Sequence, residues 1–252
     1  MAQINWTDWL MGLGLNGVLW TIASLAPKKL LTPAGYAHAV FLGVLVWGSL
    51  GWRGYLVVMV YFLLGSAVTR LGMAQKEAAG IAEKRSGMRG PENVWGSALT
   101  ATFCAIVAWG VQQFYPPGSA LVPMLILGYV ASFATKLADT TASEVGKAYG
   151  QRTFLITTFQ PVPRGTEGAV SLEGTLAGVG GSLVIAIVAW SIQLISPLGM
   201  LICIVAAFVA TNAESVIGAT WQNDLPWLTN ERVNIINTTI GAIVAIGLAA
   251  LF

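Results

Sequence analysis

The sequence has little charge and few side chains that bind metals. Only 10% of its 252 residues are Asp, Glu, Lys or Arg, whereas a soluble domain carries about 25%. It has two cysteines, Cys104 and Cys203, and one histidine, His38, each in or beside an apolar run. These three give no metal-ligand spacing, so no metal site is expected on them. No Lys/Arg stripe is interleaved with aromatics either, so we expect no nucleic-acid partner.

The familiar phosphate-binding motifs are also missing. The sequence has no G-x-x-x-x-G-K-[ST] loop, and it lacks the protein-kinase set of a Gly-rich loop, H-R-D and D-F-G. A soluble P-loop enzyme or a protein kinase is therefore excluded. Any nucleotide chemistry in this chain must use another arrangement of side chains.

Apolar residues are abundant instead. They make up 56% of the sequence, the mean hydropathy is +0.71, and runs long enough to cross a bilayer recur along the chain. This predicts an all-α polytopic membrane protein, a single transmembrane domain over residues 1–252 with about eight spans. The expected spans are 9–26, 34–50, 55–71, 95–114, 120–138, 172–195, 197–218 and 233–252. Gly174, Gly178 and Gly181 in the sixth span predict close helix contact.

The basic residues orient these spans. If the spans alternate in direction, every Lys and Arg except Arg53 falls on one side, which the positive-inside rule makes the cytoplasmic side. Both termini are then expected on the non-cytoplasmic side. Three cytoplasmic loops, 73–94, 139–171 and 219–232, are expected to form the active site.

One stretch concentrates the charge. If Lys136 to Lys147 is helical, steps of about 100° per residue place its polar residues on a single stripe. We call this the polar stripe, and it consists of Lys136, Asp139, Thr140, Ser143, Glu144 and Lys147. Such a stripe is suited to holding a polar ligand. The alternative is a solvated helix end with i, i+4 charge pairs.

Two later spans also carry polar faces. Thr211, Glu214 and Ser215 share one face of the seventh span, and Asn234 and Asn237 share a face of the eighth. A charge at the bilayer centre costs roughly 2.5–3.5 kcal/mol, so Glu214 should face a site or a partner. A polar hydrogen bond between helices is the alternative for these residues.

Two short motifs suggest a phosphate site. D-x-x-A-x-x-x-G-x-x-x-G runs from Asp139 to Gly150 and places small residues beside a carboxylate, where a backbone can approach a phosphate. S-L-E-G-T-L-A-G follows and places Glu173 where the next span begins. Carboxylates from two helices can share Mg²⁺, which prefers oxygen ligands and substrate phosphates. Lys147, Arg152 and Arg164 are the cations available to neutralise those phosphates.

The two motifs, in this order, resemble the CTP-dependent membrane polyprenol kinases, such as dolichol kinase and phytol kinase. The chain is more closely similar to the integral-membrane phytyl-phosphate kinase family of tocopherol biosynthesis. The closer likeness rests on residues 80–96, 136–147, 158–175 and 211–219 and covers nearly the whole chain. It implies transfer of the γ-phosphoryl group of CTP or another nucleotide to phytyl phosphate or a similar prenyl monophosphate, giving the diphosphate. No transit peptide precedes the first span, so a bacterial membrane, for example a cyanobacterial one, is expected.

The implied reaction brings two anions together, so positioning and electrostatic stabilisation dominate. We therefore expect Mg²⁺ as cofactor. The expected metal ligands are Asp139 and Glu173, with Glu144 and Glu214 as second candidates, and the expected catalytic residues are Asp139, Glu173 and Lys147. The expected nucleotide-binding residues are Gly146, Lys147, Gly150, Arg152, Arg164 and Thr166. The expected acceptor-phosphate residues are Lys84, Arg85, Arg89 and Asn93, with ordinary positive-inside charge as the alternative for their cations.

Two other functions stay open at this point. A transporter of a small ion or a prenyl lipid also needs acids within the membrane and broken helices, but it would place charges near mid-membrane. A nucleotidyltransferase that forms a CDP-lipid would use the same nucleotide site and differ only in the phosphorus that is attacked.

Overall fold

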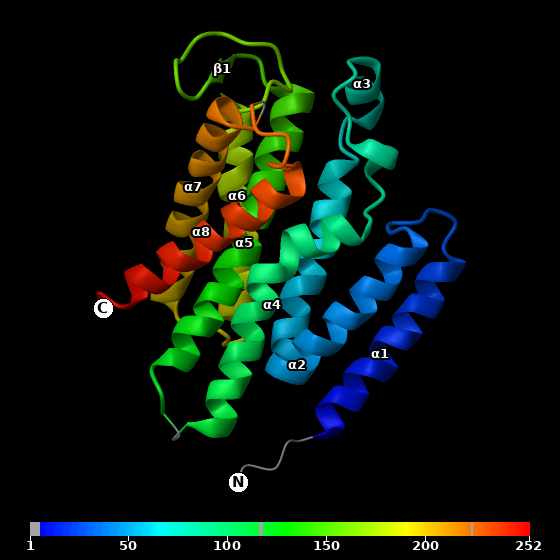
Figure 1. The fold of residues 1–252 in the computed structure, drawn as a ribbon, viewed down its shortest axis with the longest axis vertical. Coiled ribbons are helices and arrows are strands. Elements are labelled where there is room, and N and C mark those ends of the chain that lie inside the picture. The colour runs from blue at the N-terminus through cyan, green and yellow to red at the C-terminus, as the bar shows by residue number, and fades with distance from the viewer. Residues whose placement is uncertain (1–5, 116–117, 223) are drawn as a thin grey trace.

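The computed structural model describes residues 6–115, 118–222 and 224–252, except for the side chains of Lys84 and Ser86. Its helices are α1 (Trp6–Leu25), α2 (Pro33–Thr69), α3 (Met73–Ala78), α4 (Pro91–Phe114), α5 (Leu121–Tyr149), α6 (Leu172–Ser191), α7 (Pro197–Thr220) and α8 (Asn230–Ala249). A short 3₁₀ helix, η1 (Lys84–Gly87), and two strands, β1 (Thr153–Leu155) and β2 (Ala169–Ser171), complete it. Among these residues, 6 helices are long and apolar enough to cross a membrane, namely α2 and α4 to α8. The predicted polytopic all-α class is thereby confirmed (Figure 1).

Helix α2 contains two of the predicted spans. Its 37 residues are interrupted at Gly51, which has φ 63° and ψ −160°. A left-handed φ of this kind favours glycine, which has no Cβ to clash with the backbone. The chain reverses direction there, so the halves before and after Gly51 lie beside each other (Figure 1). The G-W-R-G turn between the second and third predicted spans is therefore confirmed.

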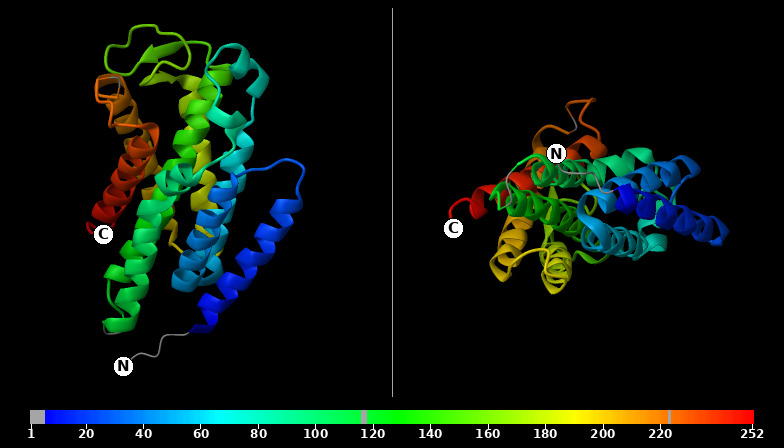
Figure 2. Two further views of the ribbon diagram at one scale, coloured as in Figure 1. Left: turned by 45° about the vertical axis from the view of Figure 1, so that its right-hand side comes forward. Right: turned by 90° about the horizontal axis from the view of Figure 1, so that it is seen from below.

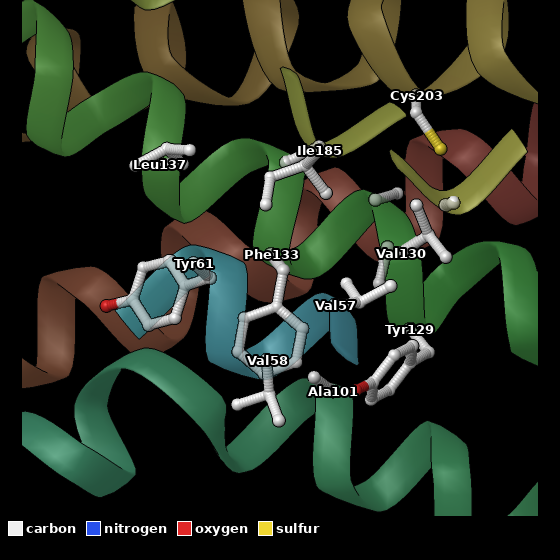
Figure 3. Packing of buried hydrophobic residues seen from close by; sticks show 14 of the residues in the cluster. Val57, Val58, Tyr61, Ala101, Tyr129, Val130, Phe133, Leu137, Ile185 and Cys203 are labelled. Atoms are coloured by element: carbon white, nitrogen blue, oxygen red, sulfur yellow. The ribbon is translucent and has the colours of Figure 1, made fainter. Parts of the chain in front are cut away.

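Helix α5 is the centre of the bundle. It contacts α2, α4, α6, α7 and α8, and its residues Tyr129 and Phe133 are fully buried. The Phe133 ring lies 5.1 Å from that of Tyr61 on α2, and the Tyr129 hydroxyl donates a hydrogen bond to the Gly54 carbonyl oxygen at 2.6 Å (Figure 3). These contacts place the last turns of α5, with the polar stripe, in fixed positions.

The predicted close helix contact of Gly174, Gly178 and Gly181 is confirmed, and the partner is α5. A Cβ at Gly174 would lie 2.7 Å from the Ala142 carbonyl oxygen, and one at Gly181 would lie 2.5 Å from Thr141 Oγ1. Both distances are shorter than a Cβ tolerates, so any larger residue would push the two helices apart. The small residues thus allow the backbones of α5 and α6 to approach closely.

The polar segments gather at one end of the bundle, which we call the loop end. It holds α3, η1, the two strands and the C-terminal ends of α5 and α7, while α1 begins at the opposite end (Figures 1 and 2). The predicted loop 139–171 needs correction, because α5 remains helical to Tyr149. The rest of that segment forms a small antiparallel sheet in which Thr153 pairs with Ser171. That the loop end faces the cytoplasm stays a prediction from the basic residues.

Candidate active site

A polar cavity of about 210 Å³ opens at the loop end. It lies between the last turns of α5, the loop that joins β1 to β2, and the facing ends of α6, α7 and α8. Every residue of the polar stripe lines it. The helical spacing therefore predicted correctly which side chains of α5 share one space. We call this space the carboxylate cavity.

The carboxyl groups of Asp139 and Glu214 meet in the carboxylate cavity, one from α5 and one from α7. Both carboxyl groups line this space and are near neighbours there. Lys136 forms an ion pair with Asp139 and donates a hydrogen bond to Asn234 Oδ1 at 2.7 Å. Lys136 and Lys147 both lie near these carboxyl groups. Two neighbouring carboxylates repel each other when both are ionised, and a bound cation would relieve that repulsion.

Glu214 also makes the contact that the alternative interpretation expected. The side-chain amide of Asn237, on α8, donates a hydrogen bond to the Glu214 carboxylate, and Asn237 is fully buried. This bond fixes one oxygen of Glu214 and orients the other. Glu214 therefore both forms a hydrogen bond between helices and lines the cavity.

A divalent metal ion would need ligands beyond these side chains. Within the described part of the chain, no group of three His, Cys, Asp or Glu side chains is placed to hold a metal. Mg²⁺ is commonly bound by one or two carboxylates together with substrate phosphates and water. Asp139 and Glu214 fit that mode of binding.

Glu144, a second metal candidate, is paired with a lysine of α3. It forms an ion pair with Lys76, and the two side chains are 2% and 1% exposed. Lys76 Nζ also donates to the Thr69 carbonyl oxygen at 2.8 Å. The pair joins α3 to α5, and Lys76 is a buried partner of a cavity-lining residue that the sequence interpretation missed. No local pattern marks it, because its partner lies far away in the sequence.

Some predicted residues lie outside the carboxylate cavity. Glu173, Gly150 and Arg152 are not among its lining residues. The Glu173 carboxylate instead accepts a hydrogen bond from the backbone N–H of Gln151 at 3.3 Å. A Cβ at Gly150 would lie 3.0 Å from Ser171 Oγ, so this glycine allows the start of α6 to pack on the end of α5.

The other predicted nucleotide-binding residues do line the carboxylate cavity. They are Gly146, Lys147, Arg164 and Thr166. Arg164 lies on the loop between the strands, and its guanidinium donates to the Ala148 carbonyl oxygen at 3.2 Å. This bond holds the exposed Arg164 side chain near the last turn of α5.

A second and larger cavity adjoins the first. Its volume is about 630 Å³, and the predicted acceptor residues Arg85, Arg89 and Asn93 line it. We call it the cation cavity. Lys136, Thr140, Lys147, Glu167 and Asn234 line both cavities. The predicted acceptor cations and the predicted nucleotide lysine Lys147 therefore line the same cavity.

The two arginines of the cation cavity are held differently. Arg85 forms an ion pair with Glu92 and donates to Asn93 Oδ1 at 3.0 Å, at an exposed position. Arg89 donates to the Tyr61 hydroxyl at 2.9 Å and its guanidinium lies over the Tyr61 ring. The side chain of Lys84, a further predicted acceptor residue, lies outside the described residues.

The fold and this site define a polytopic membrane protein with a polar site at one end. Residues 16–242 match the family described as integral membrane protein DUF92, and the chain belongs to that family. It is 63% identical over 243 residues to an uncharacterized membrane protein of Synechocystis sp., covering 96% of this chain and 92% of the relative. It is 44% identical over 240 residues to protein VTE6, chloroplastic, of Arabidopsis thaliana, covering 94% of this chain and 71% of the relative.

A more distant relative comes from an archaeon. An uncharacterized membrane protein of Methanocaldococcus jannaschii is 29% identical over 248 residues, covering 97% of both chains. No solved structure matches this chain. The family membership that the motifs indicated is confirmed by these matches.

Proposed function

We propose that this protein is a membrane prenyl-phosphate kinase. It transfers the γ-phosphoryl group of CTP or another nucleotide to phytyl phosphate or a similar prenyl monophosphate. The observation that carries the proposal is that Lys147 lines both the carboxylate cavity and the cation cavity. A nucleotide in the first and a phosphate in the second would thus face each other across one ammonium group. The resemblance of the motifs to phytyl-phosphate kinases supports the same reaction.

The side chains divide into two groups. Lys147, Arg164, Thr166 and the backbone at Gly146 would bind the nucleotide phosphates in the carboxylate cavity. Arg85, Arg89 and Asn93 would bind the acceptor phosphate in the cation cavity. In the reaction, an oxygen of the acceptor phosphate forms a bond to the γ-phosphorus. The bond from that phosphorus to the β-γ bridging oxygen breaks, and the nucleoside diphosphate leaves.

Asp139 and Glu214 are the carboxylates that we assign to Mg²⁺. Both line the carboxylate cavity, whereas Glu173 does not. Lysines pair with both Glu144 and Asp139, but the Glu144 side chain is only 2% exposed, whereas that of Asp139 is 17% exposed. When bound, Mg²⁺ would neutralise charge on the nucleotide phosphates. The cations around the site address the main difficulty of the reaction, which is that both reactants are anions. We place the site on the cytoplasmic side of a bacterial membrane, where nucleotides and Mg²⁺ are abundant.

The identity of the labelled product tests the reaction. Purified protein is incubated with γ-labelled CTP or ATP, Mg²⁺ and a panel of prenyl monophosphates. We expect the label in a prenyl diphosphate. A nucleotidyltransferase would instead release the label in pyrophosphate, and a transporter would consume no nucleotide. Either of these results across the whole panel would refute the kinase.

A further inference from the structure

A third cavity lies on the other side of Arg89. It has a volume of about 330 Å³ and runs between α1, both halves of α2 and the start of α4. Most of its lining is apolar, with Leu19, Val58, Met59 and Phe62 among the residues. We call it the apolar groove. Its lining is unsuited to a nucleotide but suited to a hydrocarbon chain.

The apolar groove adjoins the cation cavity. Tyr61, Arg89, Asn93 and Ser97 line both. Arg89 is fixed at this junction by its backbone, because its N–H donates to the Leu30 carbonyl oxygen and its own carbonyl accepts from Thr32 N–H, each at 3.0 Å. The guanidinium group of Arg89 therefore lies at the boundary between the apolar groove and the cation cavity.

A neutral polar pair lies at the far end of the apolar groove. The Tyr55 hydroxyl donates a hydrogen bond to Asn16 Oδ1 at 2.9 Å, and both residues line the groove. Along α2, Tyr55 lies about 9 Å from Tyr61 at ~1.5 Å of rise per residue. The groove is thus long enough for the part of a prenyl chain next to the phosphate, and the remainder would extend among the lipids.

We propose that the apolar groove holds the isoprenoid chain of the acceptor and that Arg89 holds its phosphate at the junction. This inference rests on the proposed function and adds the place and the orientation of the lipid. The occupant must combine an apolar chain with an anionic head, because the groove is apolar and the group at its junction is cationic. A chain seated in this way directs its phosphate into the cation cavity, towards Lys147. Helix α1, which packs chiefly on α2, leaves the groove on the lipid-facing side of the bundle.

Filling the apolar groove tests the inference. Ala23 on α1 and Ala39 on α2 both line it, whereas Ala37 is exposed and does not. We expect Ala23→Phe and Ala39→Phe to lower kcat/KM for phytyl phosphate by roughly tenfold or more, since a hydrophobic pocket discriminates at that level by shape. A five-carbon prenyl phosphate should be used as before, and Ala37→Phe, the matched control, should leave both substrates unchanged. Equal losses for the two substrates in both groove variants would overturn the inference.

Photochemical cross-linking tests the groove without turnover. A prenyl monophosphate with a diazirine on its second isoprene unit is bound to the intact protein in detergent and irradiated. We expect adducts on the groove-lining segment around Val58 and Met59, reduced by excess phytyl phosphate and by Ala39→Phe. Adducts confined to α6 or α7 would overturn the inference even in an active kinase. Adducts in the groove of a protein without kinase activity would refute the proposed function and retain the lipid site.

Discussion

Polar groups are buried in different ways on the two sides of Arg89. On the side of α3, α5 and α7, charged groups are buried in pairs, as in Lys76 with Glu144 and Lys136 with Asp139. Around the apolar groove the buried polar contact is neutral, between Asn16 and Tyr55. A neutral hydrogen bond satisfies polar atoms in the membrane at low cost, whereas a buried charge is expensive unless it is functional or paired. This chain therefore concentrates its buried charges on the side where phosphates would bind.

Breaking the most deeply buried charge pair should have the largest effect. We expect Lys76→Ala to lower the free energy of unfolding by about 3–5 kcal/mol, because it leaves the Glu144 carboxylate buried without its partner. Thermal or denaturant unfolding in detergent measures this loss. The exposed Arg85–Glu92 pair is the matched control, and Glu92→Ala should cost less than about 1 kcal/mol. A double replacement of Lys76 and Glu144 by Met should recover most of the loss; failure to recover would show that the pair has a further role.

Replacing the carboxylates of the carboxylate cavity should have the next largest effect. This effect should be on activity and not on stability. Asp139→Asn and Glu214→Gln keep the size of each side chain and remove its charge. We expect each to lower Mg²⁺-dependent turnover by at least about hundredfold, because each removes a carboxylate proposed to bind the metal. Initial rates over a range of Mg²⁺ concentrations give the measurement, and Asp224→Asn, at an exposed position outside the cavity, is the control. Near-normal rates in either variant would remove that residue from the metal site.

Arg89 lies at the border between the two sides, and its replacement should affect only the acceptor. A charge-assisted hydrogen bond contributes about 1.5–3 kcal/mol, so Arg89→Gln should lower kcat/KM for the prenyl phosphate by roughly tenfold to a hundredfold. The KM for the nucleotide should change little. Arg53→Gln, in the turn at Gly51 midway along α2, is the control. Equal losses for nucleotide and acceptor would show that Arg89 does not distinguish the two substrates.

The smallest effect is expected at Glu173. Its carboxylate lies outside the carboxylate cavity and accepts a single backbone hydrogen bond from Gln151. Glu173→Gln should therefore lower turnover by less than roughly tenfold, the size expected for one such bond. Comparison with Glu214→Gln under the same conditions checks this ranking. A loss at Glu173 that equals the loss at Asp139 would restore Asp139 and Glu173 as the metal-binding pair.

The sequence predicted the features that depend on local spacing. The length of the apolar runs located the expected spans except 9–26, whose helix α1 is not among the described helices that are long and apolar enough to cross a membrane. The G-W-R-G turn located the reversal at Gly51, and the 100° step gathered Lys136, Asp139 and Lys147 on one face. The same spacing also placed Glu214 on a polar face of its own helix. These features follow from helix geometry and bilayer thickness alone.

The sequence could not predict contacts that depend on how separate helices pack. Lys76 and Glu144 lie far apart along the chain, and no local sequence pattern around either residue predicts that they pair. Glu173 belongs to the second motif, which follows the motif that contains Asp139. The first turn of α6 nevertheless directs Glu173 towards Gln151, and the carboxylate next to Asp139 is that of Glu214. The strands β1 and β2 were missed because three-residue strands are too short for a recognisable alternation.

The reversal at Gly51 has a consequence for the biosynthesis of the protein. The helical segments before and after it are joined with almost no intervening chain, so neither can cross the membrane and leave the other behind. We therefore expect the nascent chain to integrate both as one hairpin. With the loop end on the cytoplasmic side, as proposed above, only the short turn would be translocated. Arg53 is the one basic residue in that turn, and its guanidinium lies 5.6 Å from the Trp52 ring centroid. In the proposed orientation, the turn would cross with this single positive charge and lie at the far surface, where an aromatic ring such as that of Trp52 is typical of the membrane interface.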